Sequence, residues 1–144
     1  MQFSSVILAA LMGSAAMAAP IAEPDRNMMV AGASWTMQTF TRTCNSADTS
    51  CKYNYTINPH DVAATPCSYT VTAASKASRA SYNNVKCGNF VISSNWSGQF
   101  GDGKGFQTLA VVRNRQIIYP GYADTELVNG TAFSPDKAYT PQNI

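Results

Sequence analysis

The stretch Cys51-Lys-Tyr-Asn-Tyr-Thr-Ile57 decides the fold. Its odd positions are apolar or aromatic, namely Cys51, Tyr53, Tyr55 and Ile57, whereas the positions between them are polar. Because successive side chains of a β-strand point to opposite faces, this alternation predicts a strand with one buried and one exposed face.

The same alternation continues on both sides of this stretch. In Cys67-Ser-Tyr-Thr-Val-Thr72 the residues predicted to point inward are Cys67, Tyr69 and Val71. Upstream, Trp35 and Met37 lead a further strand that runs to about Arg42 and is expected to change face near Phe40. The first half of the chain therefore predicts three neighbouring strands.

The second half predicts further strands that are separated by turn residues. Residues 85–97 read as one strand with a break at Gly88-Asn89, and residues 124–128 as a last short strand. Phe106–Arg113 and Gln116–Tyr119 flank Asn114-Arg115, which predicts a β-hairpin. Residues 73–81 lack an apolar stripe and are expected to form a polar loop with one turn of helix. These patterns together predict an all-β domain, either a small antiparallel β-barrel or a sandwich.

The chain start has the features of a secretory signal peptide. Residues 2–18 carry no charge, contain a short apolar run and end in Ala16-Met17-Ala18, a small-x-small cleavage pattern. A membrane anchor would need roughly 20 apolar residues, and this run is far shorter. We therefore expect a signal peptide (1–18), a flexible leader (19–33) and a secreted β domain (34–144), with no insertion into a membrane.

Four cysteines in a secreted chain predict two disulfides. Of the three possible connectivities we prefer Cys44–Cys51, which would close a hairpin, with Cys67–Cys87, whose members both lie on inward faces. A zinc site is the alternative, but the chain has no C-x-x-C motif and a single histidine. We therefore predict neither a metal nor a cofactor.

Three N-glycosylation sequons fit the secretory route. Asn54 falls on the outward face of its strand, and Asn129 precedes a glycine in a predicted loop and is expected to be the most accessible. Asn95 adjoins Trp96 and is expected to be used less. We predict that at least one of the three is occupied.

The charge balance excludes some classes of partner. The formal net charge is +2 and charged residues make up 12% of the chain, which is too mild for a nucleic-acid or anionic-membrane surface. Arg113 and Arg115 form the one close basic pair of the second half, and a solvated hairpin tip explains them better than a phosphate site.

Catalytic patterns are weak. His60 is the only histidine and lies in a predicted loop, which excludes two-histidine acid–base chemistry. Glycoside chemistry needs a pair of carboxylates, for which Asp102, Asp124 and Glu126 are the candidates; Asp102 lies in the glycine-rich loop 98–105. Both tryptophans, Trp35 and Trp96, are expected in the core. We therefore predict a protein that is not an enzyme.

Short motifs resemble those of a known group of secreted proteins. A signal sequence beginning Met-Gln-Phe, a Trp-x-Met-x-x-Phe-x-Arg stretch (Trp35 to Arg42) and a Cys-Gly-x-Phe (Cys87 to Phe90) look like fungal small secreted elicitor and effector proteins of the β-barrel group around the major Alternaria allergen. The resemblance implies an all-β, disulfide-bonded protein without a defined active site. It matches Cys67 and Cys87 to the central bridge of that group. No further cysteine is present to link a dimer covalently, so a monomer or a non-covalent dimer is expected.

The resemblance implies a function in recognition. We expect a secreted fungal effector or elicitor that acts through its surface on a plant host protein or cell-surface component and induces defence or cell-death responses. The alternative is a secreted carbohydrate-binding module or small glycoside hydrolase that uses the three acids named above. The loop 98–105 and the Asn114 hairpin lie after the last cysteine, and we expect any adaptable surface there.

Overall fold

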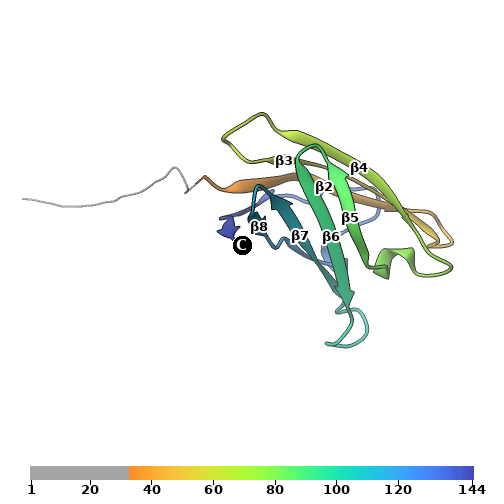
Figure 1. The fold of residues 1–144 in the computed structure, drawn as a ribbon. Helices are drawn as coiled ribbons and strands as arrows, with labels where there is room; N and C mark the ends of the chain where they lie inside the picture. Colours follow the sequence, from red (N-terminus) through yellow and green to blue (C-terminus); the bar gives the residue numbers. More distant parts are fainter. Residues whose placement is uncertain (1–32) are drawn as a thin grey trace, which may run out of the picture. The chain divides into compact units, whose positions relative to one another are not determined.

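Two antiparallel β-sheets pack against each other in the computed structural model, which describes residues 33–144 (Figure 1). The predicted signal peptide and nearly all of the predicted leader lie outside the described residues. The two sheets do not close into a barrel, so the all-β prediction is confirmed in its sandwich form. No helix within residues 33–144 is long and apolar enough to cross a membrane.

The first sheet is built around the alternating stretch from Cys51 to Ile57. Its strands are β2 (Trp35–Cys44), β3 (Ser50–Asn58), β4 (Thr65–Thr72) and β10 (Lys137–Tyr139), in the order β10-β2-β3-β4. All of these pairings are antiparallel. The short β10 places the C-terminal part of the chain beside the first strand.

The second sheet contains the later strands, in the order β11-β8-β7-β6-β5. The strands are β5 (Tyr82–Cys87), β6 (Phe90–Ser97), β7 (Phe106–Arg113), β8 (Gln116–Ile118) and β11 (Gln142–Asn143), and β9 (Gly121–Ala123) also pairs with β7. Two single turns of 3₁₀ helix complete the chain, η2 (Ala77–Arg79) and η3 (Asp124–Glu126).

Two sequence-based expectations for this sheet need correction. Residues 85–97 form two strands of a hairpin, β5 and β6, because the turn at Gly88 reverses the chain. Residues 124–128 begin with η3 instead of forming a strand, because Asp124 and Glu126 bind neighbouring groups and hold the backbone in a turn. The helical turn predicted in residues 73–81 is present as η2.

The predicted alternation is observed in the core. All four odd positions from Cys51 to Ile57 are buried, as is Cys67, whereas Tyr69 and Val71 are partly buried against the core. The change of face near Phe40 is also confirmed, since the β2–β3 register shifts between Gln38 and Thr41 and Thr39 has a φ of 51°. This bulge adds one residue to β2 and thereby keeps Phe40 and Arg42 on the inner face.

Tyrosine side chains join the two sheets. The Tyr69 hydroxyl on β4 lies 2.8 Å from that of Tyr55 on β3 and 2.7 Å from that of Tyr82 on β5. Burial raises the pKa of each of these hydroxyls above the ordinary tyrosine value. The cluster is therefore a neutral, hydrogen-bonded contact between the edge strands of the two sheets.

The structure contains two disulfides, as the sequence predicts. They join Cys44 to Cys51 and Cys67 to Cys87, with Cα–Cα distances of 4.0 and 5.4 Å. The first closes the β2–β3 hairpin, and the second links β4 of one sheet to β5 of the other. By the chain-entropy model Cys67–Cys87 is expected to stabilise the fold by on the order of 3 kcal/mol, and the shorter Cys44–Cys51 loop by about 2 kcal/mol.

The prediction that Arg113 lies at a solvated hairpin tip is wrong. Arg113 is 7% exposed, whereas Arg115 is exposed. Along β7 the buried residues are Gln107, Leu109, Val111 and Arg113, so the period-two pattern carries the arginine inward. Its guanidinium lies over the rings of Trp35 and Phe90 at 5.0 and 5.4 Å, which accounts for its burial.

Candidate functional site

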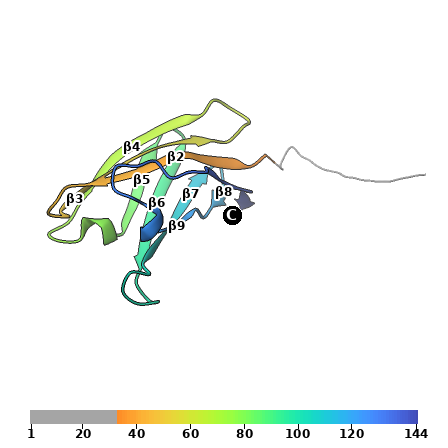
Figure 2. The same ribbon diagram turned by 180° about the vertical axis from the view of Figure 1, so that it is seen from behind.

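A pocket of about 240 Å³ lies between the loop that follows β6 and the turn η3. The loop projects away from both sheets, which is visible in both ribbon views (Figure 2). The pocket is lined by four glycines of the loop and by five side chains, namely Arg79, Trp96, Gly98, Gly101, Asp102, Gly103, Gly105, Asp124 and Thr125. It thus coincides with the loop 98–105 where the sequence places an adaptable surface.

Trp96 forms one wall of this pocket. Its side chain is partly buried, so the core position expected for both tryptophans holds for Trp35, which is 1% exposed, and not for Trp96. A Cβ atom added to Gly98 or Gly105 would lie 2.6 or 2.3 Å from the indole. Glycine at both positions therefore leaves the space that the indole occupies.

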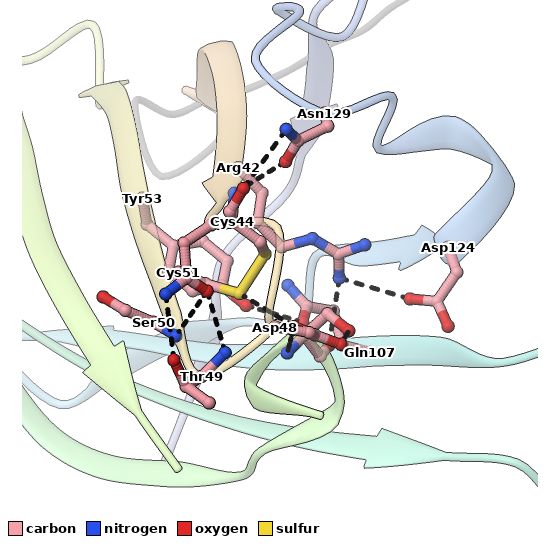
Figure 3. Close-up of a disulfide and its surroundings, with 12 residues drawn as sticks. Arg42, Cys44, Asp48, Thr49, Ser50, Cys51, Tyr53, Gln107, Asp124 and Asn129 are labelled. Atoms are coloured by element: carbon pink, nitrogen blue, oxygen red, sulfur yellow. Dashed lines mark hydrogen bonds and ion pairs between the residues drawn. A yellow bond between two sulfur atoms is a disulfide. The ribbon is translucent and has the colours of Figure 1, made fainter. Parts of the chain in front are cut away.

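Asp124 holds the indole in place. Trp96 Nε1 donates a 2.8 Å hydrogen bond to one carboxylate oxygen of Asp124, and Arg42 Nη1 donates a 3.2 Å bond to the other. Arg42 is only 7% exposed. It lies on β2 of the first sheet and reaches Asp124 in η3 (Figure 3). Both oxygens of this carboxylate are thus engaged, and its charge is paired with a buried guanidinium.

The same arginine connects the pocket to the first disulfide. Arg42 Nη1 also donates to the carbonyl oxygen of Ser78 in η2 at 3.1 Å. The Ser78 hydroxyl and amide donate in turn to Asp48, at 2.7 and 2.9 Å. Asp48 belongs to the loop that Cys44–Cys51 closes (Figure 3). The disulfide-closed hairpin, η2 and η3 are therefore one hydrogen-bonded unit.

This unit places Arg79 over the pocket. Arg79 follows Ser78 in η2, and its guanidinium lies 4.9 Å from the centre of a Trp96 ring. A cation over an indole face is attracted by the ring quadrupole, which orients an otherwise flexible side chain. Arg79 and Asp102 are exposed and make no side-chain hydrogen bond or ion pair with any residue in 33–144.

The three candidate acids are not brought together. Asp102 and Asp124 line the pocket, but Glu126 does not. Glu126 accepts hydrogen bonds from Lys137 Nζ at 3.1 Å and from the Ala123 amide at 2.9 Å. Burial raises the pKa of Glu126, but these two hydrogen bonds outweigh it and the net pKa is lowered.

His60 is an exposed loop residue, as predicted. Its Nδ1 lies 2.6 Å from the carbonyl oxygen of Ser34, and no acid of the pocket contacts it among the described residues. The structure therefore gives His60 a contact with the chain before β2 and no part in the pocket.

Sequence reasoning missed three residues of this site. Arg79 and Thr125 lie in short turns without periodicity, so no signal marks them in advance. Arg42 has a signal, because it lies two residues after the inward-facing Phe40 in an extended strand. The alternation predicts that Arg42 points inward. It does not predict the partner, because Asp124 is separated from Arg42 by 82 residues.

A second hollow of about 270 Å³ lies over β2, β3 and β4, beside the sequon residue Asn54. Its lining carries no charged side chain and consists of Thr39, Thr41, Asn54, Tyr55, Thr56, Pro66, Cys67 and Ser68. One further group, Cys44, Asp48 and Cys51, has the proximity of a metal site, but both sulfurs are bonded to each other. The second hollow therefore lacks the charged groups of the Trp96 pocket, and the thiols of the second feature are used by the disulfide.

All three sequon asparagines are exposed. The Asn129 amide differs from the others, because its oxygen accepts a 2.6 Å hydrogen bond from the Cys44 amide and its nitrogen donates to the Cys44 carbonyl at 3.3 Å. This side chain thus pairs with the backbone of the last residue of β2 (Figure 3).

Comparison with known proteins identifies a family and a relative. Residues 36–144 match the family described as Effector TSP1. A protein from Hypocrea virens (strain Gv29-8 / FGSC 10586) named Effector TSP1 is 40% identical over 147 residues, and the alignment covers 100% of this chain and 99% of that relative. The expected class of fungal effector is confirmed, whereas the finer resemblance to the Alternaria allergen group stays a prediction.

Proposed function

The chain belongs to the Effector TSP1 family and is a fungal effector, and on that premise we propose that it is secreted and acts by binding a plant host component. The proposed partner is a host protein or a constituent of the host cell surface, and the proposed result is a defence or cell-death response. The contact surface is the pocket of Trp96 and Arg79 together with the loop 98–105.

The contacts of the three candidate acids favour binding over catalysis. Hydrolysis of a glycoside needs two carboxylates on either side of the scissile bond. In the pocket Asp124 is committed to Arg42 and Trp96, and Glu126 lies outside it and is paired with Lys137. Asp102 is then the one acid of the pocket with no partner in residues 33–144, and it lacks a second acid.

Secretion and glycosylation belong to the same proposal. The uncharged, alanine-rich stretch 2–18 supports export, and two disulfides fit an oxidising compartment. We propose glycans at Asn54 and Asn95, whose side chains are exposed and make no hydrogen bond within residues 33–144. Asn129 is the less favoured acceptor, because its amide binds Cys44.

Two parallel assays test the proposal. Purified protein infiltrated into leaves is expected to give an oxidative burst or necrosis, and heat-denatured, reduced protein is not. The same preparation incubated with plant and fungal polysaccharides is expected to release no reducing ends. Release of sugar that Asp102→Asn and Asp124→Asn abolish in folded protein would establish the hydrolase alternative instead, and a leaf that shows no response would refute the effector role proposed here.

A further inference from the structure

We propose that the Trp96 pocket is a subsite for one neutral sugar ring of an oligosaccharide. The inference rests on the proposed function, because it names the chemistry that the recognition surface binds. The argument depends on the side chains that line the pocket, on how they are held, and on the size of the space between them.

The lining offers hydrogen-bonding groups of both kinds. The Arg79 guanidinium only donates, the Asp102 carboxylate only accepts, and the Thr125 hydroxyl does both. A sugar presents hydroxyls that each need a donor and an acceptor nearby. Planar guanidinium and carboxylate groups can each bind two adjacent hydroxyls at once.

The charges select against ionic ligands. Asp124 is neutralised by Arg42, so the remaining charges of the pocket are one cation and one anion, Arg79 and Asp102. An anionic ligand would be attracted by the guanidinium but repelled by the carboxylate, and a cationic ligand the reverse, so the pocket favours neither sign of charge. A neutral polyol meets no like charge.

The pocket is organised before a ligand arrives. Arg79 lies on Trp96, Trp96 is bound to Asp124, and Asp124 is bound to the buried Arg42. Fixing polar side chains in advance lowers the entropy that a ligand loses when it binds. On the loop side the backbone of Gly98 and Gly105 lies against the indole, at a distance that a Cβ atom would not allow.

The size of the pocket limits the ligand to a short segment. About 240 Å³ is below the range of roughly 300–1,000 Å³ that is typical for drug-sized ligands, so one ring fits and the rest of an oligosaccharide extends outside. Phe100, in the same loop, is 64% exposed and stacks on Phe106 with ring centroids 5.7 Å apart. Its free face is a platform for the C–H face of a neighbouring ring.

Intrinsic tryptophan fluorescence provides a direct test, since Trp96 lines the pocket and Trp35 is buried elsewhere. The full secreted protein is titrated with cellohexaose and xylohexaose as plant-wall probes and with laminarihexaose and chitohexaose as probes of fungal-wall glycans. Oligogalacturonate serves as the anionic comparison. We expect a saturable emission change with at least one neutral oligosaccharide, at a Kd on the order of millimolar, and a weaker response to the anion.

Variants then locate the site. Arg79→Ala and Asp102→Asn are expected to weaken binding by about tenfold or more, because each removes a charged hydrogen-bonding partner. Arg115→Ala removes an exposed arginine outside the pocket and is expected to leave the affinity unchanged. Circular dichroism confirms that each variant is folded.

The outcomes separate this inference from the proposed function. If no neutral oligosaccharide alters the emission, or if oligogalacturonate binds more tightly, the proposed site for a neutral sugar is wrong. The leaf response tests the effector role independently of this result. If Arg79→Ala loses oligosaccharide binding but keeps the full leaf response, the saccharide site stands and its link to effector action is refuted. Loss of both in this variant, with Arg115→Ala unaffected, supports the whole argument.

Discussion

Arg113 donates two hydrogen bonds to the carboxylate of Asp61, at 2.7 and 3.1 Å. The arginine lies at the buried end of β7, and the aspartate lies in the loop between β3 and β4, so the pair ties a hairpin of one sheet to a loop of the other. The hydrogen bond from Arg113 lowers the pKa of Asp61. One strand of each sheet thus carries a buried arginine on its inner face, Arg42 on β2 and Arg113 on β7.

Asp61→Asn should destabilise the fold in a pH-dependent way. We expect a loss of about 1 kcal/mol at neutral pH, a modest value because the Asp61 side chain is 52% exposed and solvent screens the pair. The pKa of Asp61 is lower in the folded state, so its contribution is complete above the unfolded value of about 3.9 and is lost as the pH falls through the folded value. Urea unfolding at neutral and at strongly acidic pH measures the difference, and an equal loss at both would contradict this explanation.

Gly105→Ala should disturb the pocket and not only the backbone. The new methyl would lie 2.3 Å from the indole of Trp96 and 2.6 Å from a carboxylate oxygen of Asp124, so one of them must move. We expect a loss of about 2 kcal/mol together with a shift in tryptophan emission. Gly121→Ala is the matched control, because nothing lies within 4 Å of its Cβ position. Equal emission spectra for the two variants would refute the packing argument.

Removing the two disulfides one at a time should give unequal losses. The sequence separation is 20 residues for Cys67–Cys87 and 7 for Cys44–Cys51, so the chain-entropy model predicts roughly 1 kcal/mol more from the former. Double serine variants of each pair, compared by thermal unfolding, test this order. A reductant is also expected to lower the Tm of the wild type markedly, and an unchanged Tm would show that the bridges do not stabilise the fold.

Alkaline pH should unfold the protein as the buried tyrosines ionise. The pKa values of Tyr55, Tyr69 and Tyr82 are raised in the folded state, so their contribution is complete below the unfolded value of about 10 and is lost as the pH rises toward the folded values. Tyrosinate absorbance and circular dichroism are expected to change together. Full ionisation of every tyrosine in a protein that keeps its native spectrum would contradict the assignment of a buried cluster.

Asn129→Ala should lower stability even in protein made without glycans. The substitution removes two hydrogen bonds to the Cys44 backbone, and we expect a loss of about 1 kcal/mol. Asn54→Ala is the control, because the Asn54 side chain is exposed and makes no hydrogen bond within residues 33–144. Protein from a bacterial host separates this structural role from glycosylation, and two equal melting temperatures would refute it.

Local pattern is enough to predict β2, β3 and β4 of the first sheet, but not the short β10, which lies beside β2. The alternation from Cys51 to Ile57, the change of face near Phe40 and the pattern from Cys67 to Val71 are all properties of neighbouring residues. At Gly88 the local pattern predicts only a break in one strand, because a glycine in a strand pattern marks either a bulge or a reversal. The partner strand decides between these two, and local sequence does not contain it.

The pocket was predictable only in part. Its loop is marked in the sequence by its glycines, and Asp102 and Asp124 are recognisable as candidate acids, but the surroundings of these acids depend on contacts between distant segments. Arg42 meets Asp124 across 82 residues, and Arg79 reaches Trp96 from a turn with no periodic signal. Arg113 was placed wrongly at an exposed tip because its charge favours solvent, whereas in the structure it follows the buried positions that alternate along β7.

The glycines that contact the Trp96 indole divide the loop into positions that differ in their tolerance of mutation. At Gly98 and Gly105 any larger residue collides with the indole, whereas nothing lies within 4 Å of the Cβ positions of Gly101 and Gly103. Gly101 and Gly103 have φ values of 105° and 73°, which favour glycine, so it is the other four positions of residues 99–104 that can change without loss of the frame that supports them. A lineage whose host learns to detect this protein, or whose target alters, can diversify that short segment while the scaffold stays intact.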